Sequence, residues 1–478
     1  MNKLLNFSII KDVTKGEWRT APKNLHESLT GGSFDTRSLG DADIFFALEG
    51  EQSDGHLYLK QLDGSGIRLI VVEKDVDPVG DIAILKVEST LGALHSMARK
   101  LAAMFNGRII SITGSSGKTT TKTWLRHTLN KRFNVLANIG SFNNQIGCPI
   151  TILSIQPEHD ILILEMGSSG LGELELLSSI APADISILLN VGHAHLGKFG
   201  SLENTYIAKT EIFSHRRKNA VSFIPFSDLK LRHYLNNLSC EYFGKGSPEF
   251  SWEQVSVNPI KREQKIKFNS CSGERTAVVN CIGEYAGELL SGILAICCKL
   301  GMIWEDIESG LTDLPQEKGR SIFLKGQNDV LVLDDTYNAN PESVISMMRT
   351  ICSVDAKKYV AVIGNLAELD AGLLESADYI IDNFPDKITD LVLSGDTGRI
   401  LRPLIEEKFP EVKTVYHESV VDIVLELQKS LNDKTVIGVK GSRSSHLERV
   451  VYALTGKTTT CRLSRCGRLN MCIACEKF

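Results

Sequence analysis

The chain has 478 residues, of which 42% are hydrophobic and 23% charged, so it can build two to four packed domains of about 100–200 residues each. Its formal net charge of −5 argues against a general nucleic-acid-binding or membrane-surface protein, although it is compatible with a local basic site. No segment approaches the roughly 18–20 apolar residues that span a bilayer, and the apolar stretch at residues 1–7 is too short for a signal peptide. We therefore expect a cytoplasmic protein whose 11 cysteines are thiols or metal ligands rather than disulfides.

Alternating apolar and amphipathic segments predict a largely parallel α/β protein with three domains and a tail. The boundaries that the pattern indicates are 1–106, 107–312, 313–455 and 456–478. The expected strands are 44–48, 67–72, 108–113, 161–164, 185–189, 330–333, 360–363, 391–393 and 436–439. The expected helices include 90–105, 122–129 and one long helical stretch at 284–310.

Residues 114–121 read Gly-Ser-Ser-Gly-Lys-Thr-Thr-Thr and lie between an expected strand and an expected helix. Gly114 and Gly117 let the backbone turn its N–H groups toward phosphate oxygens, Lys118 supplies positive charge, and Thr119 offers a hydroxyl to Mg²⁺. This order of strand, loop, lysine, threonine and helix predicts a nucleotide phosphate site. The alternative is a Gly/Ser turn before an ordinary helix.

Two further strand ends carry polar side chains that suit a nucleotide site. Glu165 ends the strand at 161–164, and His193 and His195 follow the strand at 185–189. Ligands of open α/β sheets gather at the carboxyl ends of the strands, so we expect these groups near Lys118. A structural histidine is the alternative for either imidazole, and the neighbouring elements favour a functional role for His195.

Motifs spread over residues 30–454 resemble those of the Mur ligase family. They are the stretches at 35–37, 43–51, 54–56, 141–149, 194–202, 208–213, 334–341 and 440–443. The resemblance implies a UDP-substrate domain, a central P-loop ATPase domain and a Rossmann-like C-terminal domain.

The resemblance also implies roles for individual residues. The catalytic residues would be Lys118, Lys209, His195, Asn338 and Asn340. The nucleotide would be bound by Gly114, Ser115, Ser116, Gly117, Lys118, Thr119, Thr120, Arg320 and Asp335. The substrates would be bound by Asp35, Thr36, Arg37, Asn143, Asn144, Ser169, Lys440, Ser442 and Arg443. The Mg²⁺ ligands would be Thr119, Glu165, His195 and Lys209.

Lys209 matches the lysine that the family carbamylates with CO₂. A carbamate turns a cation into an anion, which suits a Mg²⁺ site. The alternative is an ordinary surface lysine on a helix.

The implied activity is ATP-dependent, ADP-forming amide-bond synthesis through an acyl phosphate. The carboxylate substrate would be a UDP-linked muramyl peptide of cell-wall synthesis, and the amine an amino acid or a D-Ala-D-Ala-type dipeptide. Two alternatives stay open: a related ligase of specialised metabolism that joins another carboxylate and amine, and a catalytically silent nucleotide-binding scaffold.

The chain departs from the family at two motifs. The stretch Gly283-Glu284-Tyr285-Ala286-Gly287-Glu288-Leu289 stands where the family has G-x-H-N-x-x-N, whose Asn side chains approach the adenine. Ser169-Gly170 replaces an Asn-His pair after the central acid. We therefore expect looser nucleotide selectivity, and the identity of the substrates stays open.

The tail carries Cys461, Cys466, Cys472 and Cys475 in the spacing C-x₄-C-x₅-C-x₂-C. Four thiolates at this density predict a structural Zn²⁺ site, with a reactive or unstructured tail as the alternative.

Overall fold

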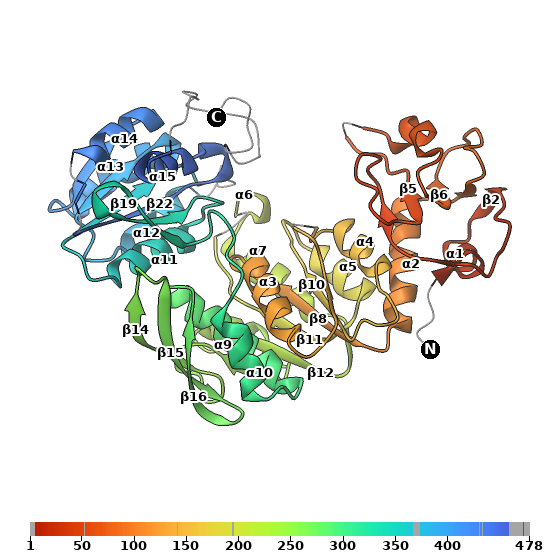
Figure 1. The fold of residues 1–478 in the computed structure, drawn as a ribbon, viewed down its shortest axis with the longest axis horizontal. Helices are drawn as coiled ribbons and strands as arrows, with labels where there is room; N and C mark the ends of the chain where they lie inside the picture. The colour runs from red at the N-terminus through yellow and green to blue at the C-terminus, as the bar shows by residue number, and fades with distance from the viewer. Residues whose placement is uncertain are drawn as a thin grey trace.

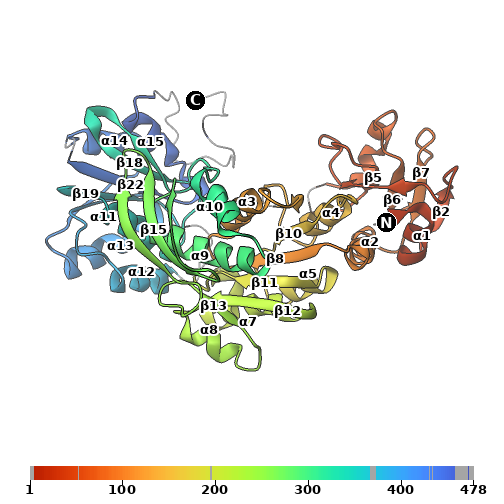
Figure 2. The same cartoon turned by 60° about the horizontal axis from the view of Figure 1, so that its bottom comes forward.

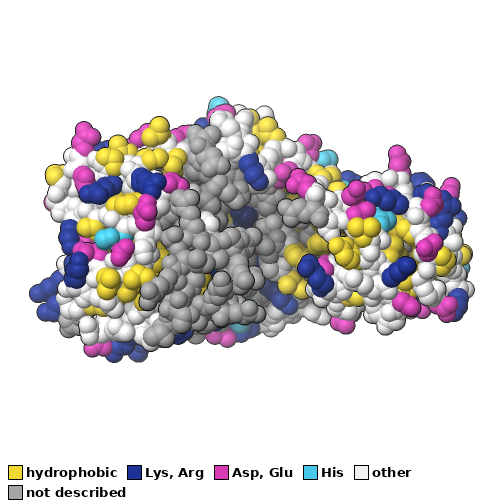
Figure 3. Space-filling model, turned by 90° about the horizontal axis from the view of Figure 1, so that it is seen from above, with side chains coloured by type: hydrophobic (Ala, Val, Ile, Leu, Met, Phe, Trp, Pro, Cys, Tyr) yellow, Lys and Arg dark blue, Asp and Glu magenta, His cyan; other side chains and the backbone are white. Residues whose placement is uncertain are grey.

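The computed structural model of the chain describes residues 5–51, 53–140, 142–193, 196–366, 373–429, 431–432, 434–457 and Cys472. Figure 1 shows three lobes in chain order, with helix α2 (Thr90–Met104) reaching from the N-terminal lobe to the central one. The same order of lobes is visible after rotation in Figure 2. On the face in Figure 3, Lys and Arg side chains are interspersed with Asp and Glu, as the small net charge predicts. In the described part of the chain, no helix combines the length and the apolar character needed to cross a membrane.

The N-terminal lobe is a five-stranded sheet in the order β2-β7-β6-β5-β4. Its strands are β2 (Glu17–Thr20), β4 (Gly32–Ser33), β5 (Ile44–Phe46), β6 (Leu69–Val72) and β7 (Ala83–Lys86), beside a short pair, β1 (Leu5–Asn6) and β3 (Ser28–Leu29). The lobe also contains α1 (Phe7–Thr14) and the 3₁₀ helix η1 (Gly55–Leu62). The predicted strands at 44–48 and 67–72 and the predicted helix at 90–105 are confirmed as β5, β6 and α2. Runs of buried Ile, Phe, Leu and Val form the two strands.

The central lobe is built on six parallel strands in the order β13-β12-β11-β8-β10-β9. The strands are β8 (Arg108–Thr113), β9 (Val135–Ala137), β10 (Ile161–Glu165), β11 (Ala183–Leu188), β12 (Arg216–Pro225) and β13 (Glu241–Phe243). Its helices are α3 (Lys118–Leu129), α4 (Gly147–Leu153), α5 (Glu173–Ile180), α6 (Leu196–Phe199), α7 (Leu202–Thr210), the 3₁₀ helix η2 (Glu211–Phe213), α8 (Leu229–Tyr234), α9 (Glu284–Lys299) and α10 (Trp304–Thr312). The middle strands β8, β10 and β11 are buried almost throughout, as a sheet covered on both faces requires.

The predicted single helix at 284–310 is wrong in one respect, because it is broken into α9 and α10. Gly301 adopts φ +71 between the two helices, a left-handed conformation that glycine reaches without steric cost and that ends α9.

An antiparallel sheet of β14 (Trp252–Asn258), β15 (Glu263–Ser270) and β16 (Gly273–Val279) packs beside α9. Cys271 in the turn between β15 and β16 forms a disulfide with Cys298 on α9, across Cα atoms 6.1 Å apart. The expectation that the cysteines are thiols or metal ligands is therefore wrong for this pair. The two cysteines lie 27 residues apart, and only the packing of the hairpin on α9 brings them together.

The C-terminal lobe has a six-stranded sheet in the order β17-β18-β22-β19-β20-β21, in which only β17 runs antiparallel to its neighbour. The strands are β17 (Ile322–Lys325), β18 (Leu331–Asp335), β19 (Lys358–Ile363), β20 (Asp390–Leu393), β21 (Lys413–Tyr416) and β22 (Thr435–Lys440). The helices are α11 (Pro341–Cys352), α12 (Leu373–Asp382), α13 (Gly395–Lys408), α14 (Val420–Gln428) and α15 (Glu448–Leu454), with 3₁₀ turns η3 (Gln327–Asp329) and η4 (Arg443–Ser445). The four predicted strands of this lobe are present, and the two edge strands β17 and β21 are additions.

Candidate active site

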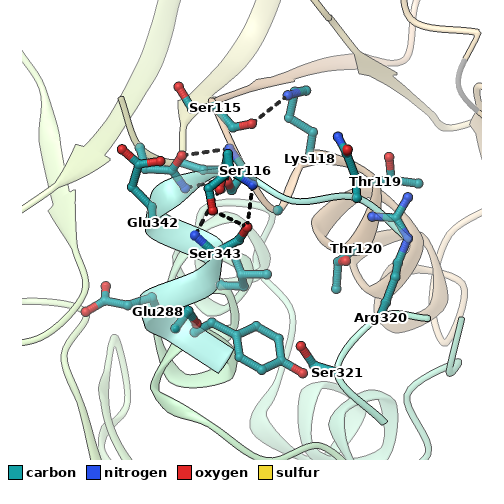
Figure 4. Close-up of a pocket in the computed structure, with 18 of the residues that line it drawn as sticks. Ser115, Ser116, Lys118, Thr119, Thr120, Glu288, Arg320, Ser321, Glu342 and Ser343 are labelled. Atoms are coloured by element: carbon teal, nitrogen blue, oxygen red, sulfur yellow. Dashed lines mark hydrogen bonds between the residues drawn. The ribbon is translucent and has the colours of Figure 1, made fainter. Parts of the chain in front are cut away.

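A pocket of about 590 Å³ is lined by residues that follow the central strands and by residues of the C-terminal lobe. In Figure 4, Ser115, Ser116 and Lys118 lie at one end of it, and Glu288 and Ser321 lie at the other. The predicted site residues that line it are Ser115, Ser116, Gly117, Lys118, Thr119, Thr120, Asn143, Arg320, Asp335, Asn338, Asn340 and Lys440. Glu165 also lines the pocket. Segments more than 300 residues apart in sequence therefore share one cavity.

The phosphate loop connects β8 to α3 in the conformation that the sequence predicts. Gly117 has φ +81, and a Cβ there would lie 2.9 Å from the Leu289 side chain, so both the conformation and the space favour glycine. Ser116 donates its N–H to Asn190 Oδ1 at 2.8 Å, and Ser115 Oγ accepts the N–H of Gly192 at 2.9 Å. These bonds fix the loop against the end of β11.

Lys118 is the first residue of α3, and its ammonium lies over the loop itself. Nζ donates to the carbonyl of Gly114 at 2.6 Å and to that of Ser115 at 3.3 Å. The ammonium is thus held within the loop whose N–H groups and helix N-terminus suit an anion. Gly114 adjoins the pocket through this contact.

Glu165 ends β10 and is almost fully buried, and it is the centre of a polar cluster. Its Oε1 accepts hydrogen bonds from Thr119 Oγ1 at 3.0 Å and from Asn143 Nδ2 at 2.9 Å. Lys122 Nζ lies 3.1 Å from Oε2 and forms a buried ion pair. The cluster brings a hydroxyl and a carboxylate together, which are the hard oxygen donors that Mg²⁺ prefers.

Lys122 is a site residue that the sequence reasoning missed. It stands one helical turn after Lys118, on the same helix, and this i, i+4 spacing was the available signal.

The C-terminal lobe contributes the opposite wall of the pocket. Asn340 Nδ2 donates to Ser116 Oγ at 2.8 Å, and the same side chain caps α11 by accepting the N–H of Ser343 at 2.9 Å. Lys440, at the end of β22, donates to Asp335 Oδ2 at 2.5 Å and to the carbonyl of Asn338 at 2.8 Å. The loop that follows β18 is thereby held against the phosphate loop.

The far end of the pocket is aromatic and partly acidic. The guanidinium of Arg320 lies 4.1 Å from the ring centroid of Tyr337, and its Nε is 2.7 Å from Glu317 Oε2. Tyr285 and Glu288 of α9 also line this end, and burial raises the pKa of Glu288. Tyr285 packs 6.4 Å from Trp124, measured between ring centroids.

Lys209 lies outside the pocket lining and is buried, contrary to the surface alternative. Its Nζ donates to Ser168 Oγ at 2.9 Å, and no ion pair to a described carboxylate accompanies it. Burial lowers the pKa of Lys209 well below its usual value, and the charge of Lys118 lowers it further.

His193 forms another contact between the central and C-terminal lobes. Its Nδ1 lies 2.5 Å from Glu342 Oε1 in the first turn of α11, and that oxygen also accepts the backbone N–H of His193. The hydrogen bond to Glu342 raises the pKa of His193. His195, the predicted Mg²⁺ ligand, lies outside the described residues.

The remaining predicted substrate residues lie away from this pocket. Asp35, Thr36 and Arg37 are in the N-terminal lobe, where Arg37 holds Asp35 through bonds of 2.7 and 2.8 Å and lowers the pKa of that carboxyl to about 2. Asn144 Oδ1 accepts from the N–H of Gly147 at the start of α4.

Three further predicted substrate residues contact nearby polar groups. Ser169 Oγ donates to Glu173, Ser442 Oγ hydrogen-bonds to Ser444 at 3.0 Å, and Arg443 Nη2 pairs with Glu448 Oε1 at 2.7 Å. None of these three lines the pocket.

Two family descriptions match the chain: "Mur ligase middle domain" over residues 112–288 and "Mur ligase, glutamate ligase domain" over residues 319–443. A UDP-N-acetylmuramoyl-tripeptide–D-alanyl-D-alanine ligase of Haemophilus influenzae is 31% identical over 88% of this chain and 93% of that protein. The Bacillus subtilis ligase of the same name is 28% identical over 93% and 97%.

Solved structures give the same result. MurF from Acinetobacter baumannii superposes with a TM-score of 0.83 at 27% identity, covering 95% of this chain and 99% of that one. MurF ligase from Thermotoga maritima, in complex with ADP, superposes with a TM-score of 0.76 at 26% identity, covering 89% and 97%.

Proposed function

The chain belongs to the Mur ligase family, and from that premise we propose that it joins D-Ala-D-Ala to a UDP-N-acetylmuramoyl-tripeptide, with ATP converted to ADP and phosphate. The observation that carries the proposal is the shared pocket, in which the Lys118 loop faces Asn340 and Lys440 of the C-terminal lobe. The relatives that match this chain nearly end to end carry that activity in their names.

We also propose the domain boundaries 1–106, 107–312 and 313–455, with the Cys-rich tail at 456–478.

The chemistry needs a carboxylate to become an acyl donor. A substrate carboxylate oxygen attacks the γ-phosphorus of ATP, the bond to the β-phosphate oxygen breaks, and ADP leaves. The amine of the second substrate then attacks the acyl carbon, loses a proton, and expels phosphate. Negative charge develops on phosphoryl oxygens in both steps, so fixed donors aimed at them lower the barriers.

The phosphate loop is suited to the first step. The N–H groups at the start of α3 and the Lys118 ammonium present positive charge to the β- and γ-phosphates. In this structure, Lys118 Nζ instead donates to the carbonyls of Gly114 and Ser115. Ser115, Ser116 and Thr120 complete the cradle. Arg320, stacked on Tyr337, reaches the nucleotide from the segment before β17.

Thr119 and Glu165 are the described residues that fit Mg²⁺, because their oxygens already approach within 3.0 Å of each other. When bound, Mg²⁺ neutralises phosphate charge and orients the γ-phosphate. Asn143 holds Glu165 in place and Lys122 balances its charge, so the pair stays ordered.

Lys209 is the residue we assign to a second anionic ligand, after carbamylation. Its lowered pKa favours the neutral amine, which attacks CO₂ to form an N–C bond and releases one proton. The product, a carbamate, is an anion that can bind a metal cation, whereas the buried ammonium of unmodified Lys209 would repel one. Ser168 Oγ lies within hydrogen-bond distance of the group.

Asn338 and Asn340 position the incoming amine from the C-terminal side. Their loop is held by Lys440 and Asp335, which makes it rigid where the two lobes meet. Asp35, Thr36 and Arg37 bind the UDP part, while Asn144, Ser169, Ser442 and Arg443 position other parts of the substrates.

The test is ADP release by purified protein against a panel of UDP-muramyl peptides and amines. We expect ADP release only when UDP-N-acetylmuramoyl-tripeptide and D-Ala-D-Ala are both present, with the joined product seen by mass spectrometry. Turnover with another carboxylate and amine, and none with this pair, would favour a ligase of specialised metabolism.

A further inference from the structure

Three buried side chains of the C-terminal lobe converge on one point away from the pocket. His446, Glu448 and Cys472 are each at least nine-tenths buried, and their ligand atoms all lie within 4.8 Å of one another. His446 and Glu448 lie beside the start of α15, and Cys472 belongs to the tail. The sequence prediction of metal binding named Cys472 but neither His446 nor Glu448, and its other three ligands, Cys461, Cys466 and Cys475, lie outside the described residues.

The distances between these atoms match those of a tetrahedral metal site. His446 Nδ1 lies 3.4 Å from Cys472 Sγ and 3.3 Å from Glu448 Oε1. Metal–ligand bonds of about 2.0–2.3 Å at tetrahedral angles place neighbouring ligand atoms about 3.3–3.8 Å apart. Both of these separations fall in that range, and the three ligand atoms all lie within 4.8 Å of one another.

The arrangement does not suit a Cys–His–Glu proton relay. In such a relay the thiol and the carboxylate contact opposite nitrogens of the imidazole. One nitrogen accepts the proton of the thiol, while the carboxylate holds the other nitrogen and so orients the ring. Here both groups approach the same nitrogen, Nδ1. Convergence on one nitrogen is the geometry expected when a cation belongs between the three groups.

One buried oxygen of the cluster, Glu448 Oε2, has no hydrogen-bond partner among the described residues, although it is shielded from solvent. A buried polar atom in this condition indicates an ion or a water that completes its interactions. The carboxylate is otherwise well supported, because its Oε1 accepts from Arg443 Nη2 at 2.7 Å and from the N–H of Cys472 at 3.0 Å. Ligating carboxylates usually have such support.

We propose that His446, Glu448 and Cys472 form a structural Zn²⁺ site that ties the C-terminal tail to the start of α15. A thiolate and an imidazole favour Zn²⁺ over Mg²⁺ or Ca²⁺, and the two negative ligands balance its charge. The ion would also hold His446 in its left-handed conformation (φ 48), which is uncommon for a residue with a Cβ. This site is independent of the ligase assignment.

The test is the metal content of full-length, untagged protein purified without chelator, measured by mass spectrometry of the elements. We expect about one zinc per chain. The variants His446→Gln, Glu448→Gln and Cys472→Ser should each weaken Zn²⁺ binding by more than about 100-fold in a chelator competition, because loss of a residue that only supports a ligand typically costs about 10–100-fold. Cys240→Ser is the matched control, because Cys240 is a free, half-buried thiol elsewhere, and it should bind zinc like wild type.

Cobalt substitution gives a readout that does not depend on stability. The Co²⁺-loaded protein should show a thiolate-to-metal charge-transfer band that Cys472→Ser abolishes and Cys240→Ser retains. Wild-type protein with only traces of zinc would overturn the proposal. So would unchanged zinc affinity in His446→Gln and Glu448→Gln, which would instead indicate a site made of tail cysteines alone.

Discussion

Asn340 donates a hydrogen bond from Nδ2 to Ser116 Oγ at 2.8 Å, although the two residues are 224 positions apart. The same side chain begins α11 by accepting the N–H of Ser343. One residue therefore couples the phosphate loop of the central lobe to the first turn of a C-terminal helix. The Asn340 side chain therefore takes part both in closing the pocket and in capping the N-terminus of α11.

The substitution Asn340→Asp separates these two roles. Aspartate keeps the oxygen that caps α11 but removes the donor to Ser116, so the thermal midpoint should stay close to wild type while kcat falls about tenfold, the value of one hydrogen bond of about 1–1.5 kcal/mol. Asn340→Ala, which loses both contacts, should also lower the midpoint. Unchanged kcat in Asn340→Asp would remove the Ser116 contact from the catalytic account.

Lys118→Ala should abolish ligation without unfolding the protein. Electrostatic contacts to a developing phosphoryl charge are commonly worth about 10²–10³ in rate, and Lys118 is the cation of the phosphate loop. Steady-state ligation and circular dichroism check the two parts. Lys261→Ala, in an exposed turn, is the matched control. A folded Lys118→Ala protein with wild-type activity would refute the nucleotide site.

Lys209→Ala should lose at least about 10² in rate by the same electrostatic argument. Added short-chain carboxylic acids should restore part of the activity, because they replace the anion that the carbamate provides. A crystal structure grown in bicarbonate should show the modified side chain. A bare Lys209 in that structure, or no rescue at any acid concentration, would count against carbamylation.

The His193–Glu342 contact should make stability depend on pH. Glu342 raises the folded-state pKa of His193, so the contribution is fully present below the ordinary pKa of about 6.5 and is lost as pH rises through the folded value. The thermal midpoint of the His193→Gln variant should therefore be lower than that of the wild type, and the difference should be largest at pH 6 and smallest at pH 9. A difference that is constant over this range would show that the ion pair contributes nothing.

This protein should discriminate less strongly between ATP and GTP than a ligase that carries the family's adenine motif. Tyr285, Ala286 and Leu289 stand where that motif has His and two Asn, and a stacking site rejects other bases less strongly than a hydrogen-bonding one. GTP should support ligation at saturation, and Tyr285→Ala should weaken both nucleotides by about 1–3 kcal/mol. Strict ATP use would contradict this prediction.

The sequence was sufficient to predict those parts of the fold that depend on local pattern. The strand at 108–113, the loop at 114–117 and the following helix follow from β-branched residues, glycines and a lysine in order, and the resemblance added the remaining motifs. The predicted pocket residues Asn143, Arg320 and Lys440 lie where those motifs meet.

The contacts between elements far apart in the sequence could not be predicted in this way. His193 and Glu342 are 149 residues apart, and Cys271 and Cys298 meet only because a hairpin packs on α9. Neither pair has a local signature, since each depends on how two lobes or two elements dock. Lys122 was missed for a different reason: a lysine in a helix usually faces solvent, and only the buried Glu165 gives it a role.

The most direct test of the account follows oxygen from substrate to phosphate. The UDP-muramyl tripeptide is labelled with ¹⁸O in its terminal carboxylate, and inorganic phosphate is analysed by mass spectrometry after ligation to D-Ala-D-Ala. The account predicts one ¹⁸O atom in each phosphate released, because the carboxylate oxygen that attacks ATP leaves with the phosphoryl group. Product formation with unlabelled phosphate would contradict the acyl-phosphate route.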